Sequence, residues 1–396
     1  MNKHRDGSSR NPHRFRRRTF LQGLAAGTLI PASLSAESKT TPRTPTAVRV
    51  CKRYDYALIR RTLGGMFDRI GDVRKLVKGK HVTVKTNLVN TPRQTVSGLP
   101  ISLTTIAHPT VALALGSLLV EYGAKHVTFC DQLPFVEEDN EAFEKYGYKI
   151  EDFRDAMENR VRFENTRNLG RYPRYDIVKV PGGGILASAW EVNQAYTKTD
   201  VLVTLGKMKS HVSGGVTLGM KNLFGIPPSS LYGDDLENTP DENAKAYRSR
   251  TMHNCTRKPF TSIDTFLGKS VEGDHGYNVP RFIVDLNAAF PTELTVIDGI
   301  STISNAEGAW MGTLVEVCRP NLLVAGLNPV CTDAVAASAM GFDPDAPDKS
   351  QPFPNGTNYL ALSRKLGLGE NRIKHLDIVG DPIEKVRYHF PPTYER

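Results

Sequence analysis

Residues 201–225 read VLVTLGKMKSHVSGGVTLGMKNLFG and combine a strand-like run with the densest cluster of polar residues in the chain. The opening run, 201–205, is apolar except for one threonine, which predicts a strand buried on both faces, as in a parallel sheet. This strand runs directly into Gly206 and Lys207. Because ligands of parallel α/β sheets bind outside the carboxyl ends of the strands, the segment predicts both a fold class and the place of a site.

The segments before it have the same alternating character. Residues 81–85 (HVTVK) and 126–131 (HVTFCD) predict two strands. Between them, 109–122 has helical periodicity and begins with a proline, which is favoured in a first helical turn. Together these segments predict a β-α-β unit with polar ends at Asn87 and Asp131.

The rest of the chain continues the alternation. It predicts strands at 175–181, 293–297, 322–326 and 376–379, and helices at 188–198, 279–290, 329–340 and 358–366. Alternation of this kind implies an α/β fold with a largely parallel sheet and helices on both faces. A polar, Gly/Asp-rich insertion at about 227–276 is long enough to predict a lid or a substrate loop.

The basic residues of 201–225 predict a pocket for an anion or a carboxylate, with one titratable histidine. Paired glycines let the backbone approach a ligand. A helix is expected to follow, with Lys221 in its second turn and with N–H groups at its start that would attract an anion. The alternative is structural: a tight glycine turn, a solvated lysine face and a capped loop histidine. The residues concerned are Lys207, Lys209, His211, Gly214, Gly215 and Lys221.

Further candidates lie in other loops and at other predicted strand ends. Arg93 has the fork geometry that binds a carboxylate, and Asn87 and Asn222 are additional candidates for binding substrate. Asp298 ends a predicted strand and Asp333 lies early in a predicted helix. Either carboxylate could orient a catalytic partner or bind a metal, and each could instead be a cap.

Common nucleotide and metal motifs are missing. The Walker spacing is absent, no G-x-G-x-x-G follows the first predicted strand, and neither H-x-x-x-H nor H-E-x-x-H occurs. The five cysteines contain no C-x-x-C pair, so no iron–sulfur cluster or thiolate zinc site is expected. Buried free thiols are the preferred interpretation of these cysteines, with one disulfide as the alternative.

The amino-terminal 36 residues carry most of the positive charge. The 396-residue chain has a net charge of +9, and residues 1–36 contain seven Lys and Arg against one acid. They also contain the twin-arginine-like run RRTFLQ at 17–22, an apolar stretch and a small-residue end at Ala36, which are the parts of an export signal. An uncleaved membrane anchor is the alternative, although a span needs about 20 apolar residues and this stretch is shorter.

We therefore expect a twin-arginine signal peptide at 1–36, a linker at 37–46 and an α/β domain at 47–396. The expected localisation is periplasmic or otherwise exported, with the twin-arginine export machinery and a small-molecule substrate as partners. No stable membrane span is expected after cleavage. Nucleic-acid binding is not expected, because the remaining charge is small and forms no basic stripe with interleaved aromatic residues.

Six motifs resemble the DUF362 family, a domain of unknown function. They are VKTNL at 84–88, HPT at 108–110, GKMKSH at 206–211, the run 217–225, IDG at 297–299 and NPVCTDAVA at 328–336, in the order of the family. Many members of this family carry a ferredoxin-like iron–sulfur module. This chain lacks the cysteines of that module.

A more distant resemblance is to nickel-pincer lactate racemases, in which a histidine precedes a Gly-Gly pair and a lysine ten residues after the histidine carries a covalent cofactor. His211, Gly214, Gly215 and Lys221 have this spacing. The resemblance implies that Lys221 is the attachment point of a cofactor, or the relic of one, and that His211 handles protons. The identity of the cofactor stays open; a nickel-containing or other metal cofactor is a candidate, with His211 and Asp333 as candidate ligands.

These observations predict an exported enzyme that acts on a small anionic or polyhydroxylated substrate by proton or hydride transfer at carbon, as a racemase-like enzyme or an oxidoreductase. The catalytic candidates are His211, Lys221 and Asp298, and the substrate-binding candidates are Asn87, Arg93, Lys207, Lys209 and Asn222. The alternative is a non-catalytic periplasmic module that binds a ligand or acts as a scaffold.

Overall fold

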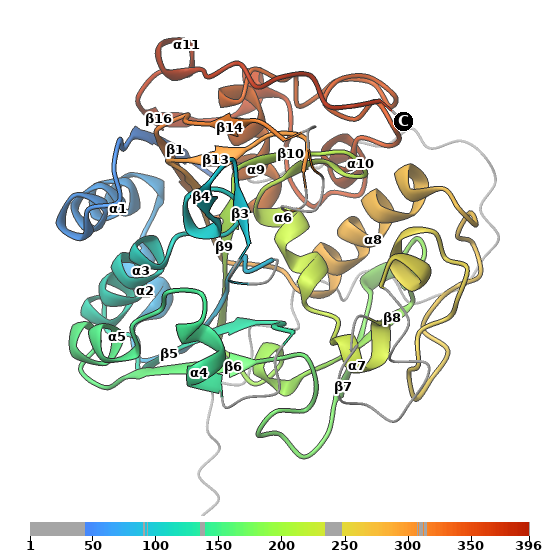
Figure 1. Cartoon of the computed structure of the whole chain (residues 1–396), viewed down its shortest axis with the longest axis horizontal. Helices are drawn as coiled ribbons and strands as arrows, with labels where there is room; N and C mark the ends of the chain where they lie inside the picture. The colour runs from blue at the N-terminus through green and yellow to red at the C-terminus, as the bar shows by residue number, and fades with distance from the viewer. Residues whose placement is uncertain are drawn as a thin grey trace, which may run out of the picture. The chain divides into compact units, whose positions relative to one another are not determined.

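The computed structural model describes residues 44–89, 92, 94–134, 139–233, 248–306, 308, 312 and 315–395. An eight-stranded sheet with the order β16-β1-β15-β12-β9-β2-β5-β6 forms the centre of this part of the chain (Figure 1). Its strands are β1 (Thr46–Val50), β2 (His81–Lys85), β5 (His126–Asp131), β6 (Val161–Asn165), β9 (Val201–Lys207), β12 (Leu294–Gly299), β15 (Leu322–Gly326) and β16 (Ile378–Gly380).

The helices and the short strands surround this sheet. The helices are α1 (Tyr56–Ile70), α2 (Val73–Val77), α3 (Pro109–Glu121), α4 (Asp139–Glu144), α5 (Ile150–Ala156), α6 (Gly219–Asn222), α7 (Ser229–Tyr232), α8 (His275–Ala289), α9 (Pro329–Ala339), α10 (Tyr359–Lys365) and α11 (Ile383–Val386). The short strands form four pairs: β3 (Thr95–Val96) with β4 (Leu99–Pro100), β7 (Asp176–Lys179) with β8 (Ala189–Val192), β10 (Lys209–His211) with β11 (Gly215–Thr217), and β13 (Thr302–Ile303) with β14 (Val317–Cys318).

The prediction of a largely parallel sheet is confirmed. β15 runs antiparallel to both of its neighbours, β1 and β12, and the other pairings in the eight-stranded sheet are parallel. Strands β2, β5 and β15 have the predicted bounds. β15 is a fully buried apolar run, whereas β2 and β5 contain β-branched and apolar residues between polar ones and are buried over most of their length.

The helix predicted at 188–198 is wrong. Residues Ala189–Val192 form β8, which pairs antiparallel with β7, and Gln194–Tyr196 form a short 3-10 helix capped by Asn193. All four residues of β8 are buried, Trp190 completely. A short strand buried on both sides shows no period of two, so its residues can be mistaken for a buried helix segment.

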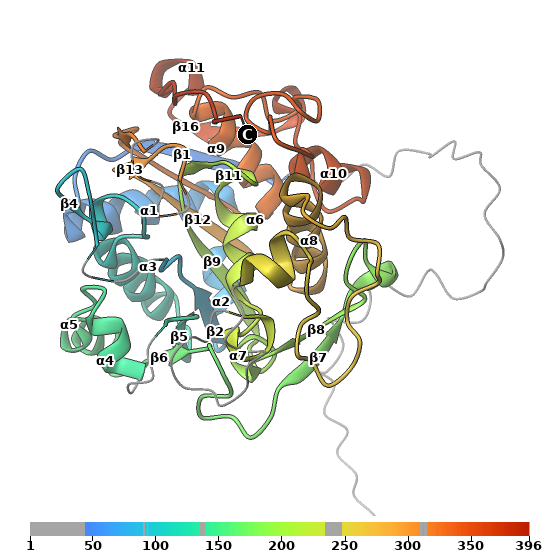
Figure 2. The same cartoon turned by 45° about the vertical axis from the view of Figure 1, so that its right-hand side comes forward.

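Side chains that alternate along the strands build two separate cores. Val203 and Leu205 of β9 pack into one core with residues of α1, α3 and α5, whereas Leu202 packs into the other with residues of α8 and α9. Figures 1 and 2 show α1 and α3 on one face of the sheet and α6 and α8 on the other. The expected coverage of both faces by helices is therefore confirmed.

The structure also contains elements that no pattern above predicts, including β1, α1 and β6. Helix α1 begins at the N-cap Asp55 and buries five apolar side chains at helical spacing. Those side chains are Ile59, Leu63, Met66, Phe67 and Ile70. Thr46, which was expected to end the linker, is instead the first residue of β1.

Several predictions fall outside the described residues. These are the signal peptide at 1–36, most of the linker at 37–46, Arg93, and residues 234–247 of the insertion. In the described part of the chain, no helix is both long enough and apolar enough to span a membrane.

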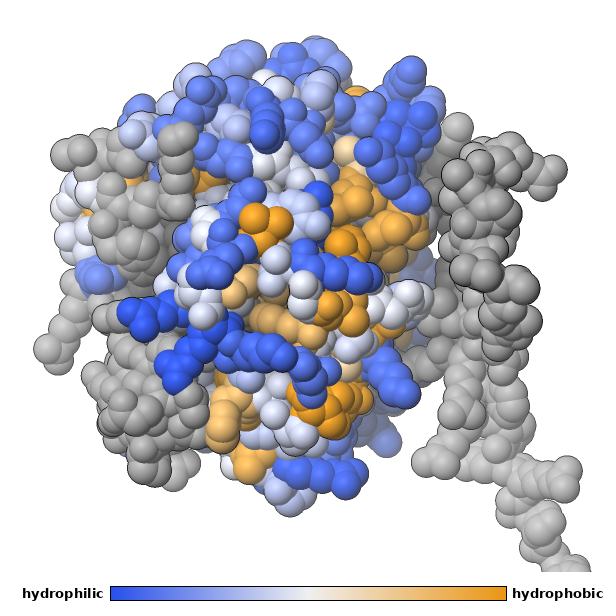
Figure 3. All heavy atoms as spheres, turned by 90° about the vertical axis from the view of Figure 1, so that its right-hand side faces the viewer, coloured by the Kyte–Doolittle hydropathy of each residue, from blue (hydrophilic) through white to orange (hydrophobic). Residues whose placement is uncertain are grey.

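Four exposed apolar residues belong to β7 and to the insertion: Ile177, Phe260, Ile263 and Val271. Figure 3 shows the corresponding side of the molecule, on which apolar groups alternate with polar ones rather than merging into one patch. Scattered exposure of this kind is normal for a protein surface, and this face therefore identifies no partner.

Candidate functional site

The chain order of the strands places a switch point between β2 and β9. The chain adds β5 and β6 beyond β2 on one side, and then adds β12 and β15 beyond β9 on the other, although β2 and β9 are themselves neighbours. In open α/β sheets, the place outside the carboxyl ends of two such strands is where ligands bind. The candidate site is therefore the carboxyl end of β2 and β9.

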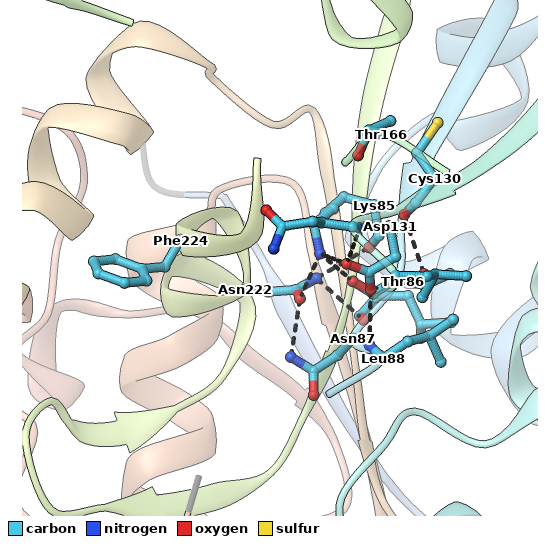
Figure 4. A network of polar contacts seen from close by, with 12 residues as sticks. Lys85, Thr86, Asn87, Leu88, Cys130, Asp131, Thr166, Asn222 and Phe224 are labelled. Carbon is cyan, nitrogen blue, oxygen red and sulfur yellow. Dashed lines mark hydrogen bonds and ion pairs between the residues drawn. The ribbon is translucent and has the colours of Figure 1, made fainter. Parts of the chain in front are cut away.

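A network of buried polar contacts lies at the end of β2 (Figure 4). Lys85 Nζ donates to Asp131 Oδ1 at 2.7 Å and to the carbonyl of Thr86 at 2.6 Å, and it reaches Asn222 Oδ1 at 3.4 Å. These contacts use the three N–H groups of the ammonium. Asp131, the last residue of β5, also accepts from the backbone N–H of Leu88 at 2.7 Å. Lys85 is therefore fully engaged within the protein.

Burial acts on both members of this pair. The side chains of Lys85 and Asp131 are 2% and 5% exposed. Burial lowers the pKa of Lys85 and raises the pKa of Asp131, because it disfavours both charged forms, and their mutual contact opposes both shifts. Each charge is thus tolerated in the interior because of the other.

Asn222, at the end of α6, joins β2 to β9. Its Nδ2 donates to the carbonyl of Lys85 at 3.0 Å and to Thr204 Oγ1 of β9 at 2.9 Å. Its Oδ1 accepts from Asn87 Nδ2 at 3.0 Å. The substrate-binding candidates Asn87 and Asn222 are therefore brought together, and the amide of Asn222 is occupied by the protein on both sides.

A second buried network lies at the ends of β9 and β12. Lys207 Nζ is 2.8 Å from Asp298 Oδ2 and 3.1 Å from the hydroxyl of Tyr54. That hydroxyl donates to Asp298 Oδ1 at 3.1 Å, and the backbone N–H of His108 donates to Asp298 Oδ2 at 3.0 Å. The rings of Tyr54 and His108 stack with centroids 3.8 Å apart. Asp298 thus forms hydrogen bonds to three segments that are distant in the sequence, those of Tyr54, His108 and Lys207.

The environment of this network keeps His108 neutral. Burial lowers its pKa to about 4, while Asp298 opposes this shift and Lys207 adds to it. Burial also lowers the pKa of Lys207, and burial together with Asp298 raises the pKa of Tyr54 well above its ordinary value. Because His108 Nδ1 accepts from the backbone N–H of Thr110 at 3.1 Å, the neutral ring carries its proton on Nε2.

The β10–β11 hairpin brings His211 and Lys221 together around a glycine. His211 Nδ1 accepts from the backbone N–H groups of Ser213 and Gly214, each at 3.1 Å, which fixes the orientation of the ring. A Cβ on Gly214 would lie 3.1 Å from Lys221 Cε and 3.8 Å from His211 Nδ1. Gly215 has a φ of 74°, and a Cβ there would collide with the ring of Phe353. The hairpin therefore depends on both glycines, for different reasons.

The described part of the insertion packs beside the loop that follows α6. Lys221 Nζ lies 5.4 Å from the ring centroid of Phe224, and the ring of His253 meets that of Phe224 edge-on at 5.4 Å. Arg248 Nη1 donates to the carbonyl of Phe224 at 3.0 Å. The insertion is thus in contact with the segment that carries Lys221, and its action as a lid stays a prediction.

The expected anion site at the start of the following helix is wrong. Helix α6 has only four residues, so Lys221 lies in its first turn rather than its second. The backbone N–H groups of Gly219 and Met220 donate at 2.8 Å to the two carboxylate oxygens of Asp333. The protein itself therefore supplies the anion at this helix start. Burial raises the pKa of Asp333 to about 7, and these two hydrogen bonds oppose the shift.

The arrangement gives little support to Asp333 as a metal ligand, because both of its oxygens already accept backbone hydrogen bonds. Among the residues that the structure describes, no three or more His, Cys, Asp or Glu side chains are grouped so as to hold a metal ion. The cysteines are free, and all but Cys255 are buried. The described residues thus do not fit a metal held by protein ligands alone.

Most of the predicted site residues lie at the carboxyl edge of the sheet, in three groups. Asn87 contacts Asn222, Lys207 contacts Asp298, and His211 and Lys221 flank Gly214. Lys209 Nζ donates to the carbonyl of Thr105 at 2.9 Å. Sequence reasoning missed Lys85 and Tyr54. The sequence did contain a signal for Lys85: this lysine is the last residue of a strand, as Lys207 is.

The fold and the site define an α/β protein whose polar residues converge on a strand-order switch point. The chain belongs to the DUF362 family, a domain of unknown function, whose family model matches residues 82–338. No curated protein matches the chain in a sequence search.

Two solved structures resemble the chain weakly. One is a Thermotoga maritima protein with 14% identity and a TM-score of 0.34, in a match that covers 64% of this chain and 52% of that one. The other is the lactate racemase apoprotein from Thermoanaerobacterium thermosaccharolyticum, with 11% identity, a TM-score of 0.35, and coverage of 72% and 54%. The chain thus matches about half the length of each.

Proposed function

We propose that this DUF362 protein is an exported enzyme that acts on a small anionic or polyhydroxylated substrate by proton transfer at carbon. The observation that carries the proposal is the pairing of His211 and Lys221 around Gly214, where the missing side chain leaves both groups next to the backbone of one loop. A titratable ring and a lysine side chain on either side of one glycine are suited to move a proton and to stabilise the negative charge that results.

The hydrogen bonds of His211 define its part in such a reaction. Its Nδ1 accepts two backbone N–H groups, so in the neutral ring the proton is on Nε2 and only that nitrogen can exchange it with a substrate. Buried Lys209, two residues before His211, adds positive charge that favours an anionic substrate. Hydride transfer would instead require an acceptor cofactor, for which Lys221 is the candidate attachment point.

The test uses full-length protein exported by a host with a twin-arginine system. Exchange of C–H for solvent deuterium is followed by NMR in a panel of hydroxy acids and sugar acids. We expect Lys221→Ala to lower the exchange rate by about a hundredfold or more, because it removes charge next to the reacting group. Lys258→Ala is the matched control, since Lys258 is exposed and pairs with Asp264 within the insertion.

Two further measurements decide between the alternatives. Elemental analysis and the intact mass of the exported protein would reveal a metal or added mass on Lys221, and either result would favour a cofactor-dependent reaction. Ligand binding without exchange in any panel member would favour the non-catalytic binding module. Cell fractionation tests export, which predicts recovery of the mature chain from the periplasm without residues 1–36.

A further inference from the structure

Asn87 presents a buried oxygen with no hydrogen-bond partner among the described residues. The residue is 5% exposed, and its Nδ2 donates to Asn222 Oδ1 at 3.0 Å. Its Oδ1 has no donor within the described part of the chain. A buried carbonyl oxygen without a donor is unfavourable, and such a group at a strand-order switch point indicates a place where a ligand supplies the donor.

The orientation of this amide is fixed by the atoms behind it. Asn222 Nδ2 faces the carbonyls of Lys85 and Leu205, which can only accept hydrogen bonds. Asn222 Oδ1 must therefore face Asn87, and Asn87 must donate a hydrogen bond to it with its NH₂ group. Figure 4 shows the consequence, since the oxygen of Asn87 points away from the network.

The support behind Asn222 is rigid. Lys85 Nζ contacts Asn222 Oδ1, and Asp131 holds that ammonium at 2.7 Å. A chain of contacts from Asp131 through Lys85 and Asn222 thus sets the direction of one acceptor atom on Asn87. Such preorganisation is typical of polar groups that select a ligand.

The neighbours of Asn87 indicate which donor fits. The backbone N–H of Ala107 donates to the carbonyl of Asn87 at 3.0 Å, and two residues earlier the carbonyl of Thr105 accepts from Lys209 Nζ. The hydroxyl of Thr105 is also buried without a partner in the described part of the chain. Closer to the amide, the ammonium of Lys85 contacts the same Asn222 oxygen as Asn87 Nδ2, so a second ammonium would be repelled there and a neutral hydroxyl is the better match.

We propose that Asn87 Oδ1 accepts a hydrogen bond from a hydroxyl group of the substrate and so selects hydroxylated over deoxygenated acids. This inference rests on the proposed function, because it specifies the hydroxyl group by which the same site would recognise its substrate. A site built to bind a hydroxyl rejects the analogue that lacks it, because its own polar group is then left unpaired.

The test compares matched probes by calorimetric or NMR titration of the full chain: lactate against propionate, and glycerate against 3-hydroxypropionate. We expect the wild type to bind the member of each pair that carries the 2-hydroxyl about tenfold or more tightly. Asn87→Ala should reduce this preference to about twofold or less, mainly by weakening binding of the member with the 2-hydroxyl, because it removes the acceptor together with the Nδ2 donor to Asn222. Asn87→Asp retains an acceptor and should retain the preference while weakening both acids through its charge.

Asn287→Ala provides the matched control. Asn287 is also 5% exposed, its Oδ1 also has no donor among the described residues, but it lies in α8 rather than at a strand end. We expect this variant to retain the wild-type preference. Binding of neither member of any pair, no preference in the wild type, or an unchanged preference in Asn87→Ala would each overturn the inference. Failure of the proposed function gives a different pattern, in which the hydroxyl preference persists without deuterium exchange.

Discussion

The two buried lysine–aspartate pairs on either side of the switch point have the same chemistry and different surroundings. Lys85 and Asp131 close β2 and β5, and Lys207 and Asp298 lie at the ends of β9 and β12. The other donors to Asp131 come from residues next to the pair, such as Leu88. Asp298 has one local donor, the backbone N–H of Ile300, and two donors from loops far away in sequence, the hydroxyl of Tyr54 and the backbone N–H of His108.

The difference assigns distinct tasks to the two pairs. All three N–H groups of the Lys85 ammonium have acceptors, and one of these acceptors, Asn222 Oδ1, also accepts from Asn87. The Lys85–Asp131 pair therefore positions the amide of Asn87 through Asn222. Asp298 instead joins Lys207 to the stacked rings of Tyr54 and His108. Identical residue pairs at equivalent strand ends thus differ in what they organise, and substitutions can separate the two.

The largest expected effect is that of removing a buried lysine. Lys85→Met should lower the free energy of unfolding by about 3–5 kcal/mol, because it leaves the Asp131 carboxylate buried without its counter-charge. The loss in the free energy of unfolding for Lys207→Met should be about 1–2 kcal/mol smaller than for Lys85→Met. The reason is that Lys85 also donates to the carbonyl of Thr86 and to the amide oxygen of Asn222. Urea denaturation of the full chain measures both values.

The double variant Lys85→Met, Asp131→Leu serves as the control for that comparison. Removing both charges should recover part of the stability lost in Lys85→Met, because no unpaired carboxylate remains. Equal losses for Lys85→Met and Lys207→Met would show that the additional contacts of Lys85 contribute nothing.

The second prediction concerns acid sensitivity, which should arise at the Lys207 pair through His108. The pKa of His108 is lowered to about 4 in the folded state, so its stabilising effect is complete above its unfolded pKa and is lost as the pH falls towards 4. Between about pH 7.5 and 5 the free energy of unfolding of the wild type should fall by about 2 kcal/mol more than that of His108→Asn. This value follows from the difference between the pKa of His108 in the unfolded and in the folded state.

Asparagine is a suitable replacement because it can still cap the N–H of Thr110 without titrating in this range. Denaturant titrations of both proteins at several pH values provide the measurement. Parallel pH profiles for wild type and variant would show that His108 is charged or solvated in the folded protein.

The smallest effect is expected for Tyr54→Phe. This change removes the hydroxyl that contacts Lys207, Asp298 and Ser301 but leaves the ring stacked on His108. A loss of about 1 kcal/mol in the free energy of unfolding is expected, because Lys207 and Asp298 remain paired. A loss as large as that of Lys207→Met would mean that the hydroxyl, rather than the ion pair, holds this network together.

Much of the sheet could be predicted because short runs rich in β-branched and other apolar residues mark buried strands. β2, β5 and β15 were located to the residue for this reason. β8 was mistaken for a helix because all of its residues are buried, so its period could not be seen. Strand order was beyond prediction, since pairing between β2 and β9 depends on contacts between segments more than 100 residues apart.

The site was predicted in its residue types and only partly in its arrangement. His211, Gly214 and Lys221 lie together because they belong to one hairpin and the short helix that follows, so local spacing was sufficient. Asp333 was expected to bind a metal or orient a partner, whereas its oxygens hold the start of α6. That contact crosses more than 110 residues and leaves no local pattern.

The sequence by itself determined the family, the α/β class and the segment that carries His211 and Lys221, because these depend on short motifs and local hydrophobic patterns. Only the tertiary structure decided which charges pair, which carboxylate caps α6, and that the amide of Asn87 presents its oxygen at the switch point. The physical reason is that a buried polar group is defined by its partners, and at this site most partners come from distant parts of the chain.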